Sequence, residues 1–417
     1  MKILRLTASL ENQLLRARHQ RDAEAERVAA RIVSDVRRRG DVALLAWTRK
    51  LDRAELRGNK LWVTEREMRA ARAGVSKSFL APAKHAARNI RRIAEQQMPR
   101  AWSLNVEPGV TISQIVRPIE TIGCYIPGGR HALVSTLLMT VISAQVAGVS
   151  RIVVVCPRPN AELLAAADYL GVSELARIGG AQAIAAFAYG TKSVPRVEKI
   201  FGPGNRFVTA AKQLVSADCA IDLPAGPTEA VVLANDGNPS WIAADLLAQA
   251  EHAPDARSFL VTTSKALAQK VQAEVAAQLQ LVPQTNPAHI STEKAGAILL
   301  APSLQAAVQF VNRFAAEHLS LPNEEVPLLK KIQASGTVFL GPWAAQAFGD
   351  YASGSNHVLP TAGWARRRGG LSTADFVKCI SVQSINRTGF RGLASHVQTL
   401  ARAEGLMAHA NAIEVRV

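Results

Sequence analysis

Seven short apolar runs rich in β-branched residues recur between residues 121 and 341, and helical stretches separate most of them. Runs of this length are typical of buried strands, and their alternation with helices indicates an α/β protein with mainly parallel sheets. The runs are numerous enough for two sheets, so we expect two Rossmann-like domains plus smaller helical terminal segments. The runs occupy 121–127, 151–156, 198–202, 230–234, 258–263, 297–301 and 337–341.

The first hundred residues have a different pattern. Apolar residues recur at three-to-four spacing over 23–52, with a break at Gly40, and again over 78–98, which predicts helices. We expect four parts in the chain. They are a helical segment at 1–24, a discontinuous main α/β domain at 25–124 and 229–370, a second α/β domain at 125–228 and a C-terminal tail at 371–417.

The chain is strongly basic, with a formal net charge of +16 over 417 residues. Nucleic-acid binding is one interpretation of such a charge. The basic clusters at 36–40, 88–92 and 365–370 are far apart in the sequence and contain no aromatic residue. We therefore expect no nucleic-acid partner, and a positive field of this kind would also attract an anionic small molecule.

Cysteine usage and hydropathy bear on the compartment. No apolar run approaches the ~20 residues needed to cross a bilayer, and the first residues do not resemble a signal peptide. The four cysteines are widely spaced and form no C-x-x-C pair, which is typical of free thiols in a reducing environment. We expect a cytoplasmic protein without a membrane segment.

Glycine and proline gather where several apolar runs end. YIPGGR, RIGGAQ and FGPGNR each follow such a run and open a helical stretch. Ligands of open α/β sheets bind at the carboxyl ends of strands, and helix amino-termini there favour anions such as pyrophosphate. A dinucleotide is one interpretation, but Phe207 stands where the G-x-G-x-x-G fingerprint needs its third glycine. The other interpretation is that these glycines and prolines form tight turns that serve only the fold.

Polar residues that seldom serve packing occur in four segments. The first ends a helix that we expect to start at Asn238, with Pro239 in its first position. Gln249 and His252 lie three apart at its end and share one face. Taken alone, a solvated helix end explains this pair more simply than a metal site.

The second segment has an adjacent Glu317 and His318 after an apolar helical stripe. Such a pair is a candidate acid/base couple, although a histidine that complements the helix dipole is an equally simple explanation. The third segment, 348–361, is a dense polar loop that contains Asp350 and His357. A loop this polar before an apolar Val-Leu-Pro is not typical of plain surface.

The fourth segment is the end of the chain, with Glu404 and His409. Together the four segments offer the imidazoles of His252 and His409, the carboxylate of Asp350 and the amide oxygen of Gln249. Nitrogen and oxygen ligands without thiolate suit zinc, manganese or a similar divalent ion. A site that leaves positions open to substrate would be catalytic.

Long stretches of the chain are similar to the motifs of the histidinol dehydrogenase family, and they occur in that family's order. They run from about residue 110 to the C-terminus, and the helical start with RRRGDVALLAWTRKLD also resembles the family's beginning. The resemblance thus covers nearly the whole chain. The stretches are YIPGGRHALVSTLLM, GGAQAIAAFAYGT, KIFGPGNRFVTAAK, LPAGPTE, LLAQAEHAPDA, NRFAAEHL, GDYASGSNHVLPT and AEGLMAHANAIEVRV.

The resemblance implies a zinc-dependent, NAD-linked enzyme that oxidises L-histidinol through L-histidinaldehyde to L-histidine, the last step of histidine synthesis. It also implies an acid/base pair of Glu317 and His318. It implies one Zn²⁺ per subunit, held by Gln249, His252, Asp350 and His409. The implied NAD contacts are Tyr125, Gln182 and Asn205. The implied substrate contacts are Thr228, Gln249, His252, Glu317, His318, Asp350, Glu404 and His409.

The resemblance further implies a homodimer in which the C-terminal tail of one chain completes the active site of its partner. The chain departs from the family in two places. Thr228 stands where the family usually has serine, so the hydroxyl is kept but an extra methyl group must fit. The stretch GPWAAQAFGDY lacks the Ser-Pro-Glu often seen ahead of Gly-Asp-Tyr.

Three other functions remain open from the sequence. A relative that acts on another amino alcohol is supported by Thr228 alone. Aldehyde oxidation at a cysteine would make Cys124 the nucleophile, although this residue lies in an apolar run with no basic neighbour. The last is a basic nucleic-acid-binding protein without enzymatic activity.

Overall fold

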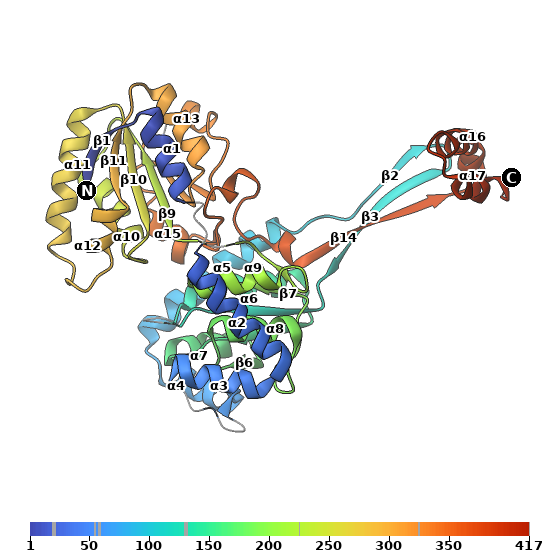
Figure 1. Cartoon of the computed structure of the whole chain (residues 1–417), viewed down its shortest axis with the longest axis horizontal. Helices are drawn as coiled ribbons and strands as arrows, with labels where there is room; N and C mark the ends of the chain where they lie inside the picture. The colour runs from blue at the N-terminus through green and yellow to red at the C-terminus, as the bar shows by residue number, and fades with distance from the viewer. Residues whose placement is uncertain are drawn as a thin grey trace.

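The computed structural model describes residues 1–18, 22–53, 56, 60–128, 132–224, 226–323 and 326–416. The glycine-rich motif residues 129–131 and position 225 of LPAGPTE therefore lie outside the described residues. The chain forms two α/β lobes, each around one parallel sheet, and an extended arm (Figure 1). We name these parts the six-stranded lobe, the five-stranded lobe and the arm.

The sheet of the six-stranded lobe has the order β1-β11-β10-β9-β12-β13, and its pairings are parallel. Its strands are β1 (Lys2–Arg5), β9 (Glu229–Leu233), β10 (Arg257–Thr262), β11 (Ala297–Leu300), β12 (His318–Leu321) and β13 (Thr337–Leu340). Consecutive residues of β10 enter different cores, Phe259 on one face and Leu260 on the other, because side chains alternate along a strand. Both faces are therefore covered by helices.

One face of this sheet packs against α1 (Ala8–Ala17), α13 (Leu304–Phe314) and α14 (Val326–Leu329). The other face packs against α10 (Pro239–Ala250), α11 (Lys265–Leu279) and α12 (Ala288–Lys294). The expected start of α10 is confirmed: Asn238 is the N-cap, its side chain accepts from the Ser240 amide, and Pro239 follows. A short helix, α15 (Gln346–Tyr351), follows β13 and contacts α10.

The sheet of the five-stranded lobe has the order β6-β5-β4-β7-β8, and its pairings are also parallel. Its strands are β4 (Thr121–Tyr125), β5 (Arg151–Val155), β6 (Glu174–Ala176), β7 (Lys199–Phe201) and β8 (Ala220–Ile221). One face packs against α4 (Glu65–Gly74), α5 (Lys77–Gln96), α6 (Val134–Ala147) and α7 (Ala161–Tyr169). The other packs against α2 (Ala23–Arg39), α3 (Asp41–Asp52), α8 (Gly180–Tyr189) and α9 (Arg206–Val215).

The arm is an antiparallel sheet of order β14-β3-β2 that projects away from both lobes (Figure 1). Its strands are β2 (Trp102–Glu107), β3 (Val110–Pro118) and β14 (Val377–Ile385). Its tip carries α16 (Arg387–Ala403) and α17 (Met407–Glu414), which pack on each other. Several apolar residues of the arm are exposed in the single chain, among them Trp102, Leu104, Val106, Ile380, Val382 and Met407.

The expected α/β class with two parallel sheets is confirmed, and each of the seven expected strands is present. The expected domain boundaries differ from the structure. Helices α2 to α5 pack on the five-stranded sheet, not on the sheet formed by 229–340, because their apolar stripes meet β4 and β5. Residues 2–5 form a strand of the six-stranded sheet. Residues 110–118 pair with 377–385 of the tail, and residues 102–107 pair with 110–118.

Along the chain, two 3-10 helices, η2 (Trp364–Arg366) and η3 (Thr373–Phe376), follow α15 and precede β14. Among the described residues, no helix combines the length and the apolar character needed to span a membrane.

Candidate active site

The candidate catalytic residues lie at the amino edge of the six-stranded sheet. His318 is the first residue of β12 and pairs with Ala230 near the start of β9. Gln249 lies in the last turn of α10, which runs from the carboxyl end of β9 back to this edge. This differs from the general expectation that open α/β sheets bind ligands at the carboxyl ends of their strands.

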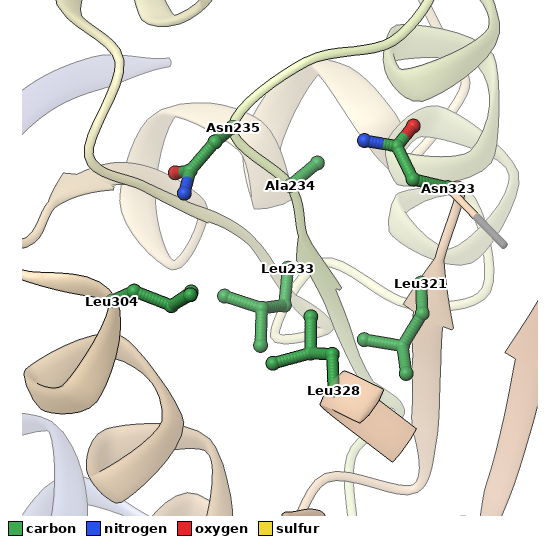
Figure 2. A pocket seen from close by; sticks show the side chains of 7 residues that line it. All are labelled: Leu233, Ala234, Asn235, Leu304, Leu321, Asn323 and Leu328. Carbon is green, nitrogen blue, oxygen red and sulfur yellow. The ribbon is translucent and has the colours of Figure 1, made fainter. Parts of the chain in front are cut away.

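The carboxyl edge of the same sheet has a small pocket between β9 and β12 (Figure 2). Its volume is about 10 Å³, which is room for about one water molecule. Asn235 already accepts hydrogen bonds from the amide and the hydroxyl of Thr263. The pocket is lined by Leu233, Ala234, Asn235, Leu304, Leu321, Asn323 and Leu328, and it is too small for a molecule the size of histidinol.

Glu317 and His318 were expected at a helix end, and the structure corrects this. Helix α13 ends at Phe314, and Ala315 has a φ of +47°, which turns the chain out of the helix. Glu317 then precedes β12, and His318 opens it. The strand is only four residues long and starts with a polar residue, so its pattern resembles the end of a helix.

The Glu317 carboxylate is buried and held from the neighbouring strand. The backbone amide of Glu229 donates to its Oε2 at 3.1 Å. The pKa of Glu317 is raised to about 7, mainly by burial and also by Asp350, although His318 and the Glu229 amide lower it. Gly336 passes so close that a Cβ there would lie 2.5 Å from the Glu317 carbonyl oxygen. Glu317 is thus a fixed carboxylate that can take a proton near neutral pH.

His318 lies between two carboxylates. Its Nε2 is 3.2 Å from Oδ1 of Asp350, and its Nδ1 is 3.8 Å from Oε2 of Glu317. Burial lowers the pKa of this imidazole, but Glu317 and Asp350 raise it by more, so the net shift is upward. Nδ1 is buried and has no hydrogen-bond partner among the described residues. This nitrogen is therefore available to a bound molecule.

The glycine of the Gly-Asp-Tyr motif serves the packing around His318. The His318 ring stacks on Phe339, with centroids 5.9 Å apart. A Cβ at Gly349 would lie 2.7 Å from the Phe339 ring, so this position needs glycine. The same turn of α15 carries Asp350, and the motif therefore fixes His318 and its carboxylate partner together.

Gln249 and Asp350 form the centre of a site that suits a cation. The Gln249 Nε2 donates to Asp350 Oδ2 at 2.9 Å, and the buried Gln249 Oε1 has no hydrogen-bond partner among the described residues. Each Asp350 oxygen accepts one hydrogen bond, from His318 or from Gln249, and keeps a second lone pair. An unpartnered amide oxygen beside a carboxylate fits a divalent metal ion.

His252 lies just beyond the helix, because α10 ends at Ala250 and Glu251 is its C-cap. The ring is exposed, and its Nδ1 is 3.1 Å from the Ala248 carbonyl oxygen. His252 also lies near the His357 ring. The pKa of His357 is lowered to about 4, mainly by burial and also by His318 and His252, although Asp350 raises it.

His409 and Glu404 do not join these residues within one chain. Both are exposed at the tip of the arm, far from the six-stranded sheet (Figure 1). Within the part of the chain that the structure describes, no three His, Cys, Asp or Glu side chains form a metal-binding group. One chain alone therefore assembles only part of the expected ligand set.

The residues expected to contact NAD lie together at the carboxyl edge of the five-stranded sheet. Tyr125 ends β4, and its hydroxyl accepts from the Gly180 amide at 3.2 Å. Gln182, on α8, donates to Asp52 at 3.1 Å and has a buried Oε1 with no partner among the described residues. Asn205 is the exposed N-cap of α9. This edge thus offers a free amide oxygen and two helix amino-termini to a ligand.

The sequence did not point to Glu229 or to Arg18, which support Glu317. Arg18 reaches from the end of α1 into the lobe, where it bonds the Phe314 carbonyl oxygen and pairs with Glu229 at 2.9 Å. Both side chains are almost fully buried. The sequence does contain one indication of Glu229: a glutamate directly before an apolar strand, as in PTEAVVLA, is a candidate for a buried charge.

The dense polar loop after Asp350 connects the two lobes. His357 Nε2 is 3.3 Å from the hydroxyl of Thr136 on α6, and Asn356 donates to the Met139 carbonyl oxygen at 3.3 Å. Asn89, on α5, donates to the Ala352 carbonyl oxygen at 2.8 Å. The loop is polar because its side chains and backbone form these hydrogen bonds with helices α5 and α6 of the five-stranded lobe.

The structure and sequence are similar to known histidinol dehydrogenases. The chain is 42% identical over 412 residues to the enzyme of Photobacterium profundum, covering 98% of this chain and 93% of the relative. It is also 42% identical over 396 residues to that of Salmonella typhimurium, covering 94% and 91%. The crystal structure of histidinol dehydrogenase from Elizabethkingia anophelis superposes with a TM-score of 0.93 at 36% identity, covering 100% of this chain and 98% of that one.

A family model described as histidinol dehydrogenase matches residues 15–417, which include the amino edge of the six-stranded sheet, the carboxyl edge of the five-stranded sheet and the whole arm. The chain belongs to the histidinol dehydrogenase family.

Proposed function

We propose that this chain oxidises L-histidinol through L-histidinaldehyde to L-histidine, with two molecules of NAD as hydride acceptors and one zinc ion per subunit. The observation that carries the proposal is the hydrogen-bonded set Gln249–Asp350–His318 with Glu317 beside it. It places an open amide oxygen, a carboxylate and a candidate base within one site. The family to which the chain belongs supports the substrate.

Zinc would be held by Gln249, His252 and Asp350 of one chain and by His409. When bound, the metal would orient the imidazole and amine of the substrate, which is a template role. The unpartnered Gln249 Oε1 supports the assignment, because a buried amide oxygen without a partner costs free energy that a ligand removes.

Two proton transfers follow from the arrangement of the base pair. We infer that His318 Nδ1 takes the hydroxyl proton of the alcohol as its hydride leaves for NAD. The aldehyde must then add water before the second hydride can leave. Glu317 takes a proton from that water, since its raised pKa makes it a competent base near neutrality. Asp350 holds the His318 ring through Nε2, which leaves Nδ1 directed at substrate.

The remaining contacts are proposed from their positions. Thr228 is half-buried directly before β9, next to Glu229, whose amide holds Glu317, so its hydroxyl would contact substrate. Tyr125, Gln182 and Asn205 would contact NAD at the edge of the five-stranded sheet.

We propose that the active protein is a homodimer in which His409 and Glu404 enter the partner's site. The arm points away from its own six-stranded lobe, and its exposed apolar residues require a cover (Figure 1). If two chains exchange their arms, each arm reaches a six-stranded lobe, that of its partner, and its exposed apolar residues become covered.

Removal of zinc is the direct test of the metal assignment. NAD reduction with histidinol is expected to fall to background after dialysis against a chelator and to return with stoichiometric Zn²⁺. NAD affinity, measured by fluorescence quenching, should stay unchanged because the proposed NAD contacts lie on the other lobe. Full turnover by protein shown to contain no metal would overturn the zinc requirement.

Cys124 provides a test of the water mechanism. Burial in β4 raises the pKa of its thiol to about 12, so almost no thiolate exists at neutral pH. We expect Cys124→Ala to keep both oxidation steps within about threefold of the unchanged protein, since the thiol is not the nucleophile. Aldehyde oxidation is measured directly with histidinaldehyde as substrate. Selective loss of that step would instead favour cysteine chemistry.

A further inference from the structure

A second polar cluster lies next to the candidate active site, one helical turn away along α10 and α15 and two residues away along β12. Gln249, His318 and Asp350, which we name the outer network, come from α10, β12 and α15. Asp245, Ser320 and Gln346, which we name the inner network, come from the same three elements. Gln346 Nε2 donates to the Ser320 hydroxyl at 2.9 Å, and its backbone amide donates to Asp245 Oδ1 at 3.4 Å.

The two networks correspond residue by residue. Asp245 lies four residues before Gln249 on α10, and Gln346 lies four residues before Asp350 on α15. Residues four apart share one face of a helix. Ser320 lies two residues after His318 on β12, and residues two apart share one face of a strand. Each residue of the inner network therefore lies on the same face of its helix or strand as one residue of the outer network.

Helix α15 depends on this cluster for its orientation. It is six residues long, and no side chain of its own caps its amino-terminus. So short a helix is not stable by itself, and tertiary contacts must hold it. The Asp245 carboxylate accepts the first amide of α15, and a negative charge is favourable at that end. The Gln346 side chain is fully buried and bonds the helix to β12.

We propose that the inner network is a positioning device for the metal site: it fixes the distance of α15 from α10 and β12 and so sets where the Asp350 carboxylate lies. This inference rests on the proposed zinc site. Asp245, Ser320 and Gln346 are not among the residues proposed to bind metal or substrate, and they would act through Asp350. Gln346 lies in the stretch GPWAAQAFGDY, which lacks the Ser-Pro-Glu often seen ahead of Gly-Asp-Tyr.

Zinc affinity measured by competition with a chromogenic chelator tests the inference on the full-length protein. Loss of support behind a metal ligand typically costs 10–100-fold in affinity. We expect Ser320→Ala and Gln346→Met each to raise the zinc dissociation constant by about 10–100-fold. Histidinol turnover at saturating Zn²⁺ should recover in part, because added metal pulls Asp350 back into place.

Ser258→Ala is the matched control. Ser258 is also a buried serine in a parallel strand of the same sheet, but it lies on β10, and its hydroxyl has no hydrogen-bond partner among the described residues, so it belongs to neither network. Only Ser320→Ala should weaken zinc binding, because it removes a hydrogen bond of the inner network and Ser258→Ala removes none. The melting temperature of each metal-free variant shows that it is folded. Gln346→Met keeps the length of the side chain and removes the same hydrogen bond as Ser320→Ala, so it still tests the inference if Ser320→Ala does not fold.

The outcomes separate the inference from the zinc assignment. Gln249→Ala is measured alongside. If it weakens zinc binding while Ser320→Ala and Gln346→Met bind zinc within threefold of the unchanged protein, the positioning role is wrong. If Gln249→Ala itself leaves zinc affinity unchanged, the proposed metal site is wrong, and the inference falls with it.

Discussion

His318→Ala is expected to lower kcat for histidinol by about 10²–10⁴-fold, the range that general base catalysis contributes. KM should change little, because substrate binding is assigned to the metal and to other side chains. Asp350 would lose its partner at Nε2 and keep only its bond with Gln249, so zinc affinity should also fall, and kcat is therefore measured at saturating Zn²⁺. Stopped-flow absorbance at 340 nm measures the first hydride transfer directly.

Glu317→Gln is the companion variant that separates the two oxidations. The amide keeps an oxygen for the Glu229 backbone N–H but cannot take a proton from water. We expect one rapid equivalent of NADH per site followed by turnover that is slower by about 10²–10⁴-fold. His318→Ala should show no such burst. A His318→Ala protein with normal kcat and a raised KM would contradict the proton-transfer role of this imidazole.

The architecture could be predicted from the sequence because it depends on local patterns. The strands β4, β5, β9 and β10 are continuous apolar runs, and both of their faces are buried. The N-cap of α10 was correct for the same reason, since Asn238 and Pro239 act within one turn. The arm could not be predicted. Its outer strands β2 and β14 are largely exposed in the single chain, so burial imposes no apolar pattern on them.

The site was predicted through resemblance, whereas each residue taken alone left a simpler explanation open. The decisive contacts are distant in sequence: the Gln249–Asp350 bond spans 101 residues, and the Glu229–Glu317 bond spans 88. No local pattern contains such a contact. β12 was missed because four residues that begin with histidine resemble a helix end. The inner network was missed because Ser320 and Gln346 bear no signal of their own in the sequence.

Deletion of residues 405–417 is expected to leave a folded protein that binds NAD but holds no zinc and has no measurable turnover. Residues 407–414 of this segment form α17 at the tip of the arm, where α17 packs on α16 and lies away from both lobes (Figure 1). Removal of such a terminal element is ordinarily tolerated by the fold. The metal, however, would lose His409, and even the loss of support behind a ligand costs about 10–100-fold in affinity.

Mixing this truncated chain with a full-length Gln249→Ala, His252→Ala chain tests where the tail acts. Each homodimer should be inactive, because one lacks the tail and the other lacks two ligands. In a mixed dimer, the intact core of the truncated chain would receive the tail of the mutant. About half of the dimers would be mixed, with one working site each, so activity should return to about a quarter of the unchanged protein. Zinc content should rise in parallel.

The two ways in which this experiment can fail have different meanings. If the truncated protein keeps stoichiometric zinc and turnover, His409 is not a ligand, and the site must be completed by residues of the six-stranded lobe. If the truncated protein loses both but the proven mixed dimer stays inactive, the tail serves its own subunit. The arm would then have to fold back from the extended position seen in the single chain (Figure 1). Its exposed β2 and β14 residues would pack on their own lobe, and Trp102 fluorescence would report that burial.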